Sequence, residues 1–146
     1  MNRVYFSVEE VPPPPWEERA KTFVLKVLHF LEKDKWDLSV LFCGNNCIRS
    51  LNVRYRNKDE ATDVLSFFLG ERERGRYLPG DIVISLEALK ENADFFKVHP
   101  DEELRRLLVH GILHLDGMDH ETNDEEEPML QFQEKIIARL AGERIL

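Results

Sequence analysis

Residues 101–120, DEELRRLLVHGILHLDGMDH, predict a helix that is buried all round in its second half, and they carry three of the chain's five histidines. At about 100° per residue, His110 and His114 lie on the same face of this helix, one turn apart. Gly117 stands where the helix should end and is free to adopt the left-handed conformation that reverses the chain. We therefore expect His120 to swing back toward the other two histidines.

Three neutral imidazoles with no fourth protein donor nearby are typical of a catalytic zinc-type site that keeps one position for water. A closed structural site would need a fourth ligand such as cysteine, and the sequence offers none close to His110, His114 and His120. The alternative is three separate packed or surface histidines. The four-then-six spacing across a glycine, on a buried helix, favours the metal site.

The same spacing occurs in metalloproteases of the H-E-x-x-H-x-x-G-x-x-H type, in which the glutamate is the general base. Here that position is Gly111, so peptide hydrolysis by that route lacks its proton acceptor. Asp116, Asp119 and Glu121 are close in sequence. Each is a candidate base, a candidate partner that holds an imidazole in place, or a solvated acid, and the sequence leaves the three alternatives open.

Outward from this stretch, strands alternate with helices and no repeat is visible. Strands are expected at Val4–Val8, Leu38–Cys43, Val64–Leu69 and Asp81–Ser85, and helices at about Trp16–Lys35, Cys47–Arg54, Leu86–Phe96, Asp101–Asp116 and Asn123–Leu140. The arginine-studded segment Gly70–Gly80 is expected to be a loop. This pattern predicts an α/β (α+β) fold, with one layered domain over residues 1–146 and a mixed sheet of about four strands packed with about five helices.

The composition argues against a membrane protein and a secreted protein. The chain of 146 residues is 42% hydrophobic and 33% charged, without an apolar run long enough to span a bilayer and without a recognisable secretion signal. A cytoplasmic location and no membrane association are therefore expected. Cys43 and Cys47 are expected to be reduced and packed. His29 is expected to be a surface or partly packed residue, and His99 a helix-boundary residue.

Charge is unevenly distributed. The net charge of −8 argues against coating nucleic acid by bulk attraction, although it leaves room for local recognition. Basic residues gather around Tyr55, namely Arg49, Arg54, Arg56 and Lys58. Arg54 and Lys58 predict either neighbours of Arg56 that position phosphate, with Tyr55 as a base-stacking ring, or simply a solvated face. The structural interpretation, in which a strand opens here, is favoured over a role in the cleft for three further residues, Thr62, Asp63 and Ser66.

Three segments together resemble the bacterial YbeY family, the endoribonucleases of ribosomal RNA maturation. His110–His120 is similar to the family's H-G-x-L-H-L-x-G-x-D-H signature. NVRYRNKDEATDVLSF, residues 52–67, resembles its arginine-containing segment followed by T-D-V-L-S-F, and GDIVIS, residues 80–85, resembles its next strand.

The resemblance implies a cytoplasmic enzyme that cuts single-stranded RNA, with zinc as the usual metal. It also implies a role in 3′-end maturation of small-subunit ribosomal RNA and in ribosome quality control. Position by position, His110, His114 and His120 match the metal ligands, and Arg56 matches the family's functional arginine. A bound metal lowers the pKa of water from about 15.7 to near 7, so a missing glutamate is tolerable. A guanidinium suits the charge that develops on phosphoryl oxygens.

Two alternatives remain from the sequence. One is a metal-dependent hydrolase of another substrate, with peptide disfavoured by Gly111. The other is a ribosome-binding assembly factor with little catalysis. The attacking group, water or the RNA 2′-hydroxyl, is left open, as are the metal and the oligomeric state.

Overall fold

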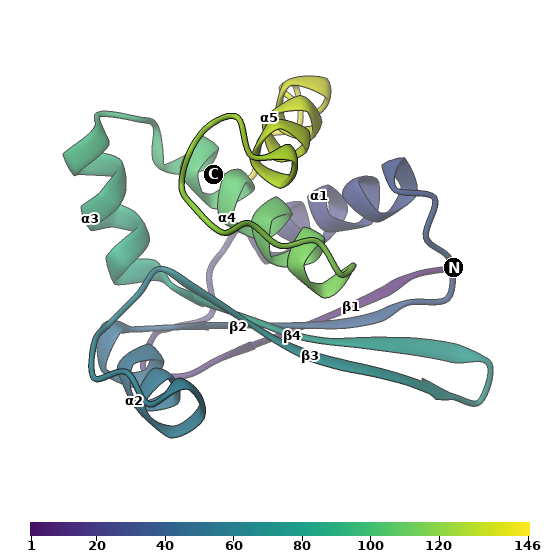
Figure 1. Ribbon diagram of the computed structural model, residues 1–146, viewed down its shortest axis with the longest axis horizontal. Coiled ribbons are helices and arrows are strands. Elements are labelled where there is room, and N and C mark those ends of the chain that lie inside the picture. The colour runs from purple at the N-terminus through teal and green to yellow at the C-terminus, as the bar shows by residue number, and fades with distance from the viewer.

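A four-stranded mixed sheet organises the chain, all 146 residues of which are described by the computed structural model. Its strands are β1 (Arg3–Val8), β2 (Asp37–Cys43), β3 (Val64–Glu73) and β4 (Arg76–Ser85). They lie in the order β1-β2-β4-β3, with β1, β2 and β4 parallel and β3 antiparallel at the edge beside β4. Figure 1 shows the sheet nearly edge-on. The expected class and strand number are confirmed, and β3 is the strand that makes the sheet mixed.

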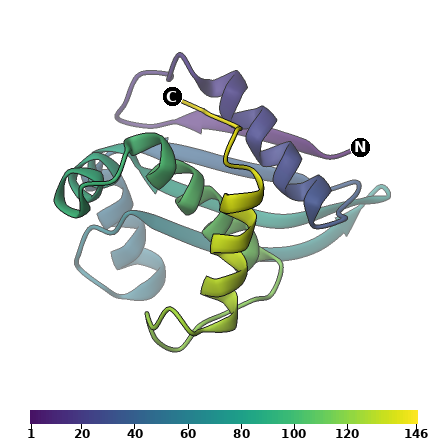
Figure 2. The same ribbon diagram turned by 90° about the horizontal axis from the view of Figure 1, so that it is seen from above.

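Five helices complete the layers: α1 (Glu17–Phe30), α2 (Asn45–Arg56), α3 (Leu86–Phe96), α4 (Pro100–Leu115) and α5 (Pro128–Arg139). Helix α2 lies alone beneath the sheet, while the other four lie above it (Figure 1). Seen from above, α5 crosses the middle of this upper layer, between α1 and α3 (Figure 2). Helix α4 is thus enclosed by the sheet and by its neighbouring helices.

Burial of α4 follows from its sequence. Ten of its residues are buried, and the fully enclosed side chains include Leu104, Leu108, Ile112 and Leu113. They belong to a core cluster of 24 residues between the sheet and the upper helices. Each such side chain stabilises the fold by roughly 1.5–3 kcal/mol when it leaves water, so α4 is the central element of the core.

The start of α4 is fixed by its sequence as well. Nδ1 of His99 accepts a hydrogen bond from the backbone N–H of Asp101, 3.1 Å away, and Pro100 occupies the first turn, where no backbone donor is needed. Acidic residues in that turn favour the positive end of the helix dipole. The expectation that His99 marks a helix boundary is confirmed, and His29 is exposed as expected.

The prediction of a loop over Gly70–Gly80 is wrong. Strands β3 and β4 continue through it and turn at Arg74 and Gly75, which have φ values of 52° and 78°. Two successive positive φ values are typical of the tight turns that match strand twist. This end of the hairpin is largely solvent-exposed, so its alternating charged residues resemble those of a loop.

Two helices are shorter than expected. Helix α1 ends at Phe30, before Glu32 and Lys35 adopt positive φ, and α5 begins only at Pro128. The cysteines are unpaired, with Cys43 buried and Cys47 half-buried, as expected. No helix has both the length and the apolar character needed to cross a bilayer.

Candidate metal centre

The chain reverses direction directly after α4. Gly117 has a φ of +92°, and its N–H donates to the carbonyl oxygen of His114 at 3.0 Å. The next N–H, of Met118, donates to the carbonyl oxygen of Leu113 at 3.0 Å. These two bonds define a Schellman motif, in which a left-handed residue satisfies the last helix carbonyls. The reversal expected at Gly117 is confirmed, and it brings His120 back toward α4.

Three imidazole rings meet at this end of the helix. The ring centroid of His110 lies 4.6 Å from that of His114 and 5.3 Å from that of His120, and the remaining pair is 5.5 Å apart. One nitrogen from each ring lies within 4.8 Å of the other two. The Nε2 atoms of His110 and His114 are 3.1 Å apart, close to the roughly 3.3 Å that separates two imidazole nitrogens on a tetrahedral zinc.

The opposite ring nitrogens have partners that set their protonation. Nδ1 of His114 lies 3.1 Å from the carbonyl oxygen of Met118, and Nδ1 of His120 lies 2.7 Å from that of Thr122. Nδ1 of His110 lies 2.7 Å from the side-chain oxygen of Gln133 on α5. Because a carbonyl oxygen only accepts, these contacts favour the tautomer in which the neutral ring has its proton on Nδ1 and its lone pair on Nε2. The donor set therefore fits a metal ion before any metal arrives.

Burial also keeps two of these rings neutral. It lowers the pKa of His110 below the ordinary value of 6.5, despite the opposing effect of Gln133. Burial, together with the neighbouring His110, likewise lowers the pKa of His114. A neutral imidazole is the form that binds a metal, so protons compete little for these two ligands near neutral pH.

Position 111 lies against the sheet, at strand β4. A Cβ built on Gly111 would stand 2.9 Å from two side-chain atoms of Ile82 on β4. The glycine therefore allows α4 to approach β4 closely, and any larger side chain at position 111 would require Ile82 to shift. A glutamate at the position used by the metalloproteases would therefore disturb the packing of α4 on β4.

The three acidic candidates from the sequence have different surroundings. Asp116 forms an ion pair with Lys33 at 2.8 Å. Asp119 accepts the backbone N–H of His120 at 2.8 Å and lies 3.9 Å from Nδ1 of His114, and it is the one carboxylate in the lining of the cleft described next. Glu121 is exposed and lies outside that lining.

A cleft of about 740 Å³ opens beside the three rings. Its lining includes Arg56 and Lys58, from the end of α2 and the segment after it, and alternate residues of β3. Nη2 of Arg56 donates to the carbonyl oxygen of Ser66 at 3.2 Å, and Oγ of Ser66 lies 3.4 Å from the carbonyl oxygen of Gly111. These contacts tie α2, β3 and α4 together at the cleft, and its lining includes all four residues singled out from the sequence, Arg56 and the three histidines.

The other basic and aromatic candidates lie elsewhere. The guanidinium of Arg54 lies over the ring of Tyr55, 5.5 Å from its centroid, and Arg49 pairs with Asp59 at 2.7 Å. Tyr55 packs against Phe67 and lines a separate groove between α2 and the sheet. Only part of the basic cluster therefore faces the histidines.

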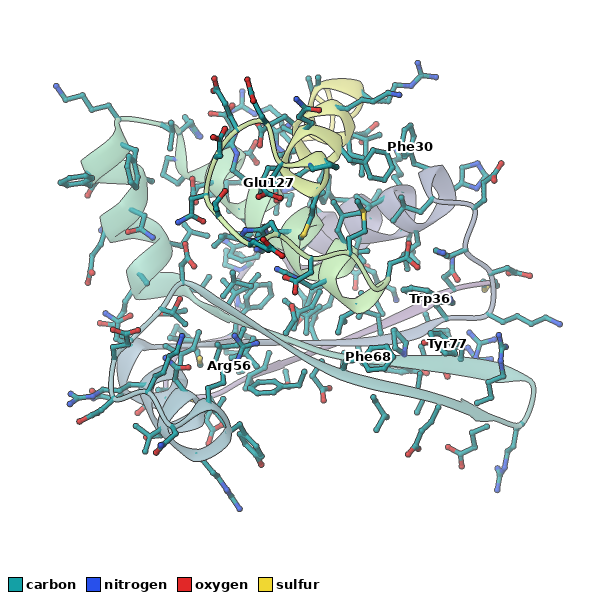
Figure 3. The ribbon with its side chains drawn as sticks, viewed as in Figure 1. Phe30, Trp36, Arg56, Phe68, Tyr77 and Glu127 are labelled. Carbon is teal, nitrogen blue, oxygen red and sulfur yellow. The ribbon has the colours of Figure 1, made fainter.

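Phe68 is the aromatic residue that the sequence analysis missed. It is 66% exposed, and it lines the cleft together with Val64 and Ser66. Figure 3 shows it on β3, with Arg56 beside α2. Strand alternation contained the signal, because residues 64, 66 and 68 must share one face while Leu65 and Phe67 face the α2 side.

The remaining strand residues divide in the same way. Ser66 lines the cleft, whereas Oδ2 of Asp63 accepts from Nδ2 of Asn92 at 3.1 Å, and its backbone carbonyl accepts from the N–H of Ser85. Asp63 therefore joins β3 to α3 and β4, as the structural interpretation expects. Thr62 lies outside the lining of the cleft.

Comparison with known proteins agrees with this geometry. The family model described as endoribonuclease YbeY matches residues 7–141. The protein named endoribonuclease YbeY of Treponema denticola is 46% identical over 142 residues, covering 93% of this chain and 92% of its own. That of Treponema pallidum is 44% identical over 144 residues, covering 95% and 90%. That of Borrelia recurrentis is 48% identical over 118 residues, covering 79% and 80%.

A solved structure gives the same result for the fold. The solution structure of a protein from Thermotoga maritima superposes with a TM-score of 0.68 at 30% identity, covering 98% of this chain and 91% of that one. The resemblance inferred from the histidine, arginine and strand segments is therefore confirmed: the chain belongs to the endoribonuclease YbeY family.

Proposed function

We propose that this chain is a metal-dependent endoribonuclease that cuts single-stranded RNA, acting in 3′-end maturation of small-subunit ribosomal RNA and in ribosome quality control. The whole of residues 1–146 forms the catalytic domain, which works in the cytoplasm on the small ribosomal subunit. The observation that carries the proposal is one cleft that joins three Nε2 donors to the guanidinium of Arg56.

His110, His114 and His120 hold the metal through Nε2, and zinc is the metal proposed because three imidazoles in a site with an open position suit it. When bound, such an ion supplies Lewis acidity that polarises a phosphoryl oxygen and acidifies water. Position 111 offers no carboxylate, and Asp119 is the one acidic side chain in the lining of the cleft. The site thus suits phosphodiester chemistry better than the glutamate-dependent peptidase route.

Arg56 binds and orients the scissile phosphate in this proposal. Its guanidinium presents several donors and only one is used, in the 3.2 Å bond to the carbonyl of Ser66. The remaining donors can bond phosphoryl oxygens on which negative charge develops. Lys58 adds a second positive charge in the same lining, so the cleft attracts phosphate although the chain as a whole is acidic.

Phe68 supplies a stacking surface next to this phosphate position. Stacking on an aromatic ring requires an unpaired base, because bases within a duplex are already stacked on one another. An exposed phenylalanine beside the histidines therefore supports a preference for single-stranded RNA.

An assay with purified, zinc-loaded protein tests the activity. Single-stranded RNA, the same sequence in duplex form and a casein-derived peptide pool are incubated with the wild type and with His114→Ala. Cutting confined to single-stranded RNA and abolished by the substitution is the expected result. RNA binding without cutting by fully loaded wild type would instead favour an assembly factor.

A cellular measurement tests the ribosomal role separately. Depletion of the protein is expected to leave small-subunit ribosomal RNA with extended 3′ ends, detected by mapping of RNA termini. Restoration of normal ends by the wild type and not by His114→Ala would assign the defect to the metal centre. Normal ends after depletion would overturn the ribosomal role while leaving the nuclease activity intact.

A further inference from the structure

We propose that Gln133 is a positioning residue for His110, and that the ion pair between Arg106 and Glu134 fixes which end of the Gln133 amide faces the imidazole. The inference rests on the proposed function, because it assigns to α5 a role in preparing a metal ligand. It adds three residues, from α4 and α5, to the machinery of the site.

Gln133 is placed to act on His110 alone. Its side chain comes from α5, is only 5% exposed, and points its Oε1 at Nδ1 of His110, 2.7 Å away. Its other end, Nε2, lies 3.2 Å from Oε2 of Glu134. Both ends of the amide are therefore engaged, and the residue bridges a ligand on one side to a carboxylate on the other.

The carboxylate decides the orientation of the amide. The hydrogen bonds from Arg106 lower the pKa of Glu134, so its oxygens only accept hydrogen bonds near neutral pH. The NH₂ end of Gln133 must then face Glu134, which leaves the carbonyl end facing His110. A carbonyl in that position requires a proton on Nδ1, so the lone pair of His110 stays on Nε2, the nitrogen nearest His114.

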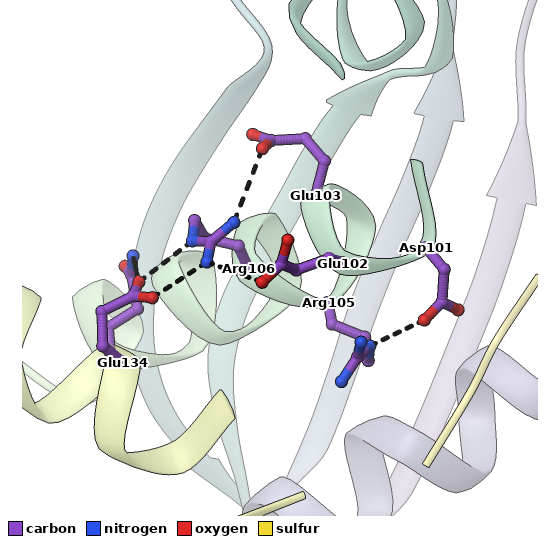
Figure 4. Close-up of polar contacts among 7 residues, drawn as sticks. Asp101, Glu102, Glu103, Arg105, Arg106 and Glu134 are labelled. Carbon is purple, nitrogen blue, oxygen red and sulfur yellow. Dashed lines mark hydrogen bonds and ion pairs between the residues drawn. The ribbon is translucent and has the colours of Figure 1, made fainter. Parts of the chain in front are cut away.

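Glu134 is itself held by two parallel bonds from one guanidinium (Figure 4). Nη2 and Nε of Arg106 lie 2.9 Å and 3.0 Å from its two carboxylate oxygens. Arg106 also approaches Glu102 at 3.5 Å and Glu103 at 3.7 Å on its own helix. A two-pronged contact of this kind fixes direction as well as distance, so the carboxylate cannot easily turn away from Gln133.

His110 differs from the other two ligands in needing such a lock. Nδ1 of His114 and Nδ1 of His120 donate to backbone carbonyls, which cannot exchange a donor for an acceptor. A glutamine amide can rotate by half a turn and present NH₂ instead, and this would force the proton of His110 onto Nε2 and block metal binding. The Arg106–Glu134 pair opposes that rotation.

Metal affinity and the protonation pattern of His110 test the inference in full-length protein, without RNA. Gln133→Met removes the acceptor at similar size, and Gln131→Met on the exposed face of the same helix is the matched control. Zinc affinity is measured by competition with a chromophoric chelator, and ¹⁵N NMR reports which nitrogen of His110 carries the proton, with and without zinc. We expect Q133M to weaken zinc binding about 10–100-fold and, in the zinc-free protein, to lose the Nδ1–H signal of His110, with Q131M unchanged in both measurements.

Glu134→Ala keeps the test decisive if Q133M folds poorly, because the Glu134 side chain is about half exposed and its loss leaves Gln133 in place. We expect E134A to weaken zinc binding less than Q133M and to give a mixture of both His110 tautomers. Zinc affinity equal to that of Q131M, with the proton of zinc-free His110 still on Nδ1 in both E134A and Q133M, would overturn the inference. A wild type that binds no zinc would contradict the proposed function instead, while the nitrogen signals would still decide the role of Gln133.

Discussion

Arg56 donates a hydrogen bond to the backbone carbonyl of Ser66, 3.2 Å away, and so the last turn of α2 is attached to the strand that lines the histidine cleft. The contact uses one end of the guanidinium and holds the side chain in the lining of the cleft. The cleft therefore holds the positive charge and the planar donor group of Arg56 at a fixed position.

Arg56→Ala is expected to lower kcat for cleavage of single-stranded RNA by about 10²–10³-fold, as removal of one preorganised donor does in other enzymes. Arg56→Lys should recover only part of this loss, because an ammonium keeps the charge and loses the planar fork. Steady-state kinetics measures both variants. Because Arg56 is exposed, the unfolding midpoint should not change; unchanged kcat in R56A with normal folding would remove Arg56 from the catalytic machinery.

The contact between Gly111 and Ile82 makes a prediction about packing. Alanine normally stabilises a helix interior by up to about 1 kcal/mol relative to glycine. Here its Cβ would meet Ile82 at 2.9 Å, and overpacking costs about 1–3 kcal/mol, so Gly111→Ala should destabilise the protein. In an Ile82→Ala background the clash disappears, and the same substitution should become stabilising.

Denaturant unfolding of the four proteins, with either change, both or neither, measures this coupling. Equal effects of G111A in the two backgrounds would show that the helix is not held against β4 by this contact.

The reversal after α4 depends on backbone conformation alone. A Cβ at Gly117 would meet no atom within 4 Å, but its φ of +92° is strained for any other residue. Gly117→Ala is therefore expected to cost about 1–2 kcal/mol of stability, and Gly117→Asn less, because asparagine tolerates positive φ better. Thermal or denaturant unfolding measures the difference; equal stability of G117A and the wild type would mean that the loop relaxes at no cost.

Asp101 predicts a pH dependence of folding. The carboxylate of Asp101 is buried, and burial by itself raises its pKa. Hydrogen bonds from the backbone N–H groups of Leu146 and Ile145, together with the Arg105 guanidinium, outweigh this effect and lower the pKa below 3.8. A depressed carboxyl pKa stabilises the fold above the unfolded value, and this stabilisation is lost as pH falls through the folded value.

Asp101→Asn should cost about 3 kcal/mol at neutral pH, because Arg105 is then left buried without its ionic partner. The difference between wild type and variant should shrink below pH 3.8, the unfolded-state value. Unfolding free energies measured across pH test this, and a difference that stays constant down to acid would contradict it.

Local geometry explains what the sequence could predict. The relation between His110 and His114 is a property of any helix, and the reversal at Gly117 needs only a residue free to adopt positive φ. Both features were therefore visible in eleven residues. The outer part of the β3–β4 hairpin was not, because solvent-facing strands carry the same charged residues as a loop.

Long-range packing explains what the sequence could not predict. Gln133 follows His110 by 23 residues and reaches it only because α5 packs on α4, so no local pattern marks it. Phe68 was inaccessible for a related reason. Its face of β3 is fixed by alternation, but which face adjoins the histidines depends on how α4 lies on the sheet.

X-ray absorption spectroscopy of the zinc-loaded protein tests the central claim most directly, namely that His110, His114 and His120 bind one ion through nitrogen and leave a position open. The account predicts one zinc per chain, three nitrogen ligands at about 2.0–2.1 Å and a further light ligand that small anions displace. Sulfur in the coordination shell, or an unchanged spectrum in His114→Ala, would contradict it.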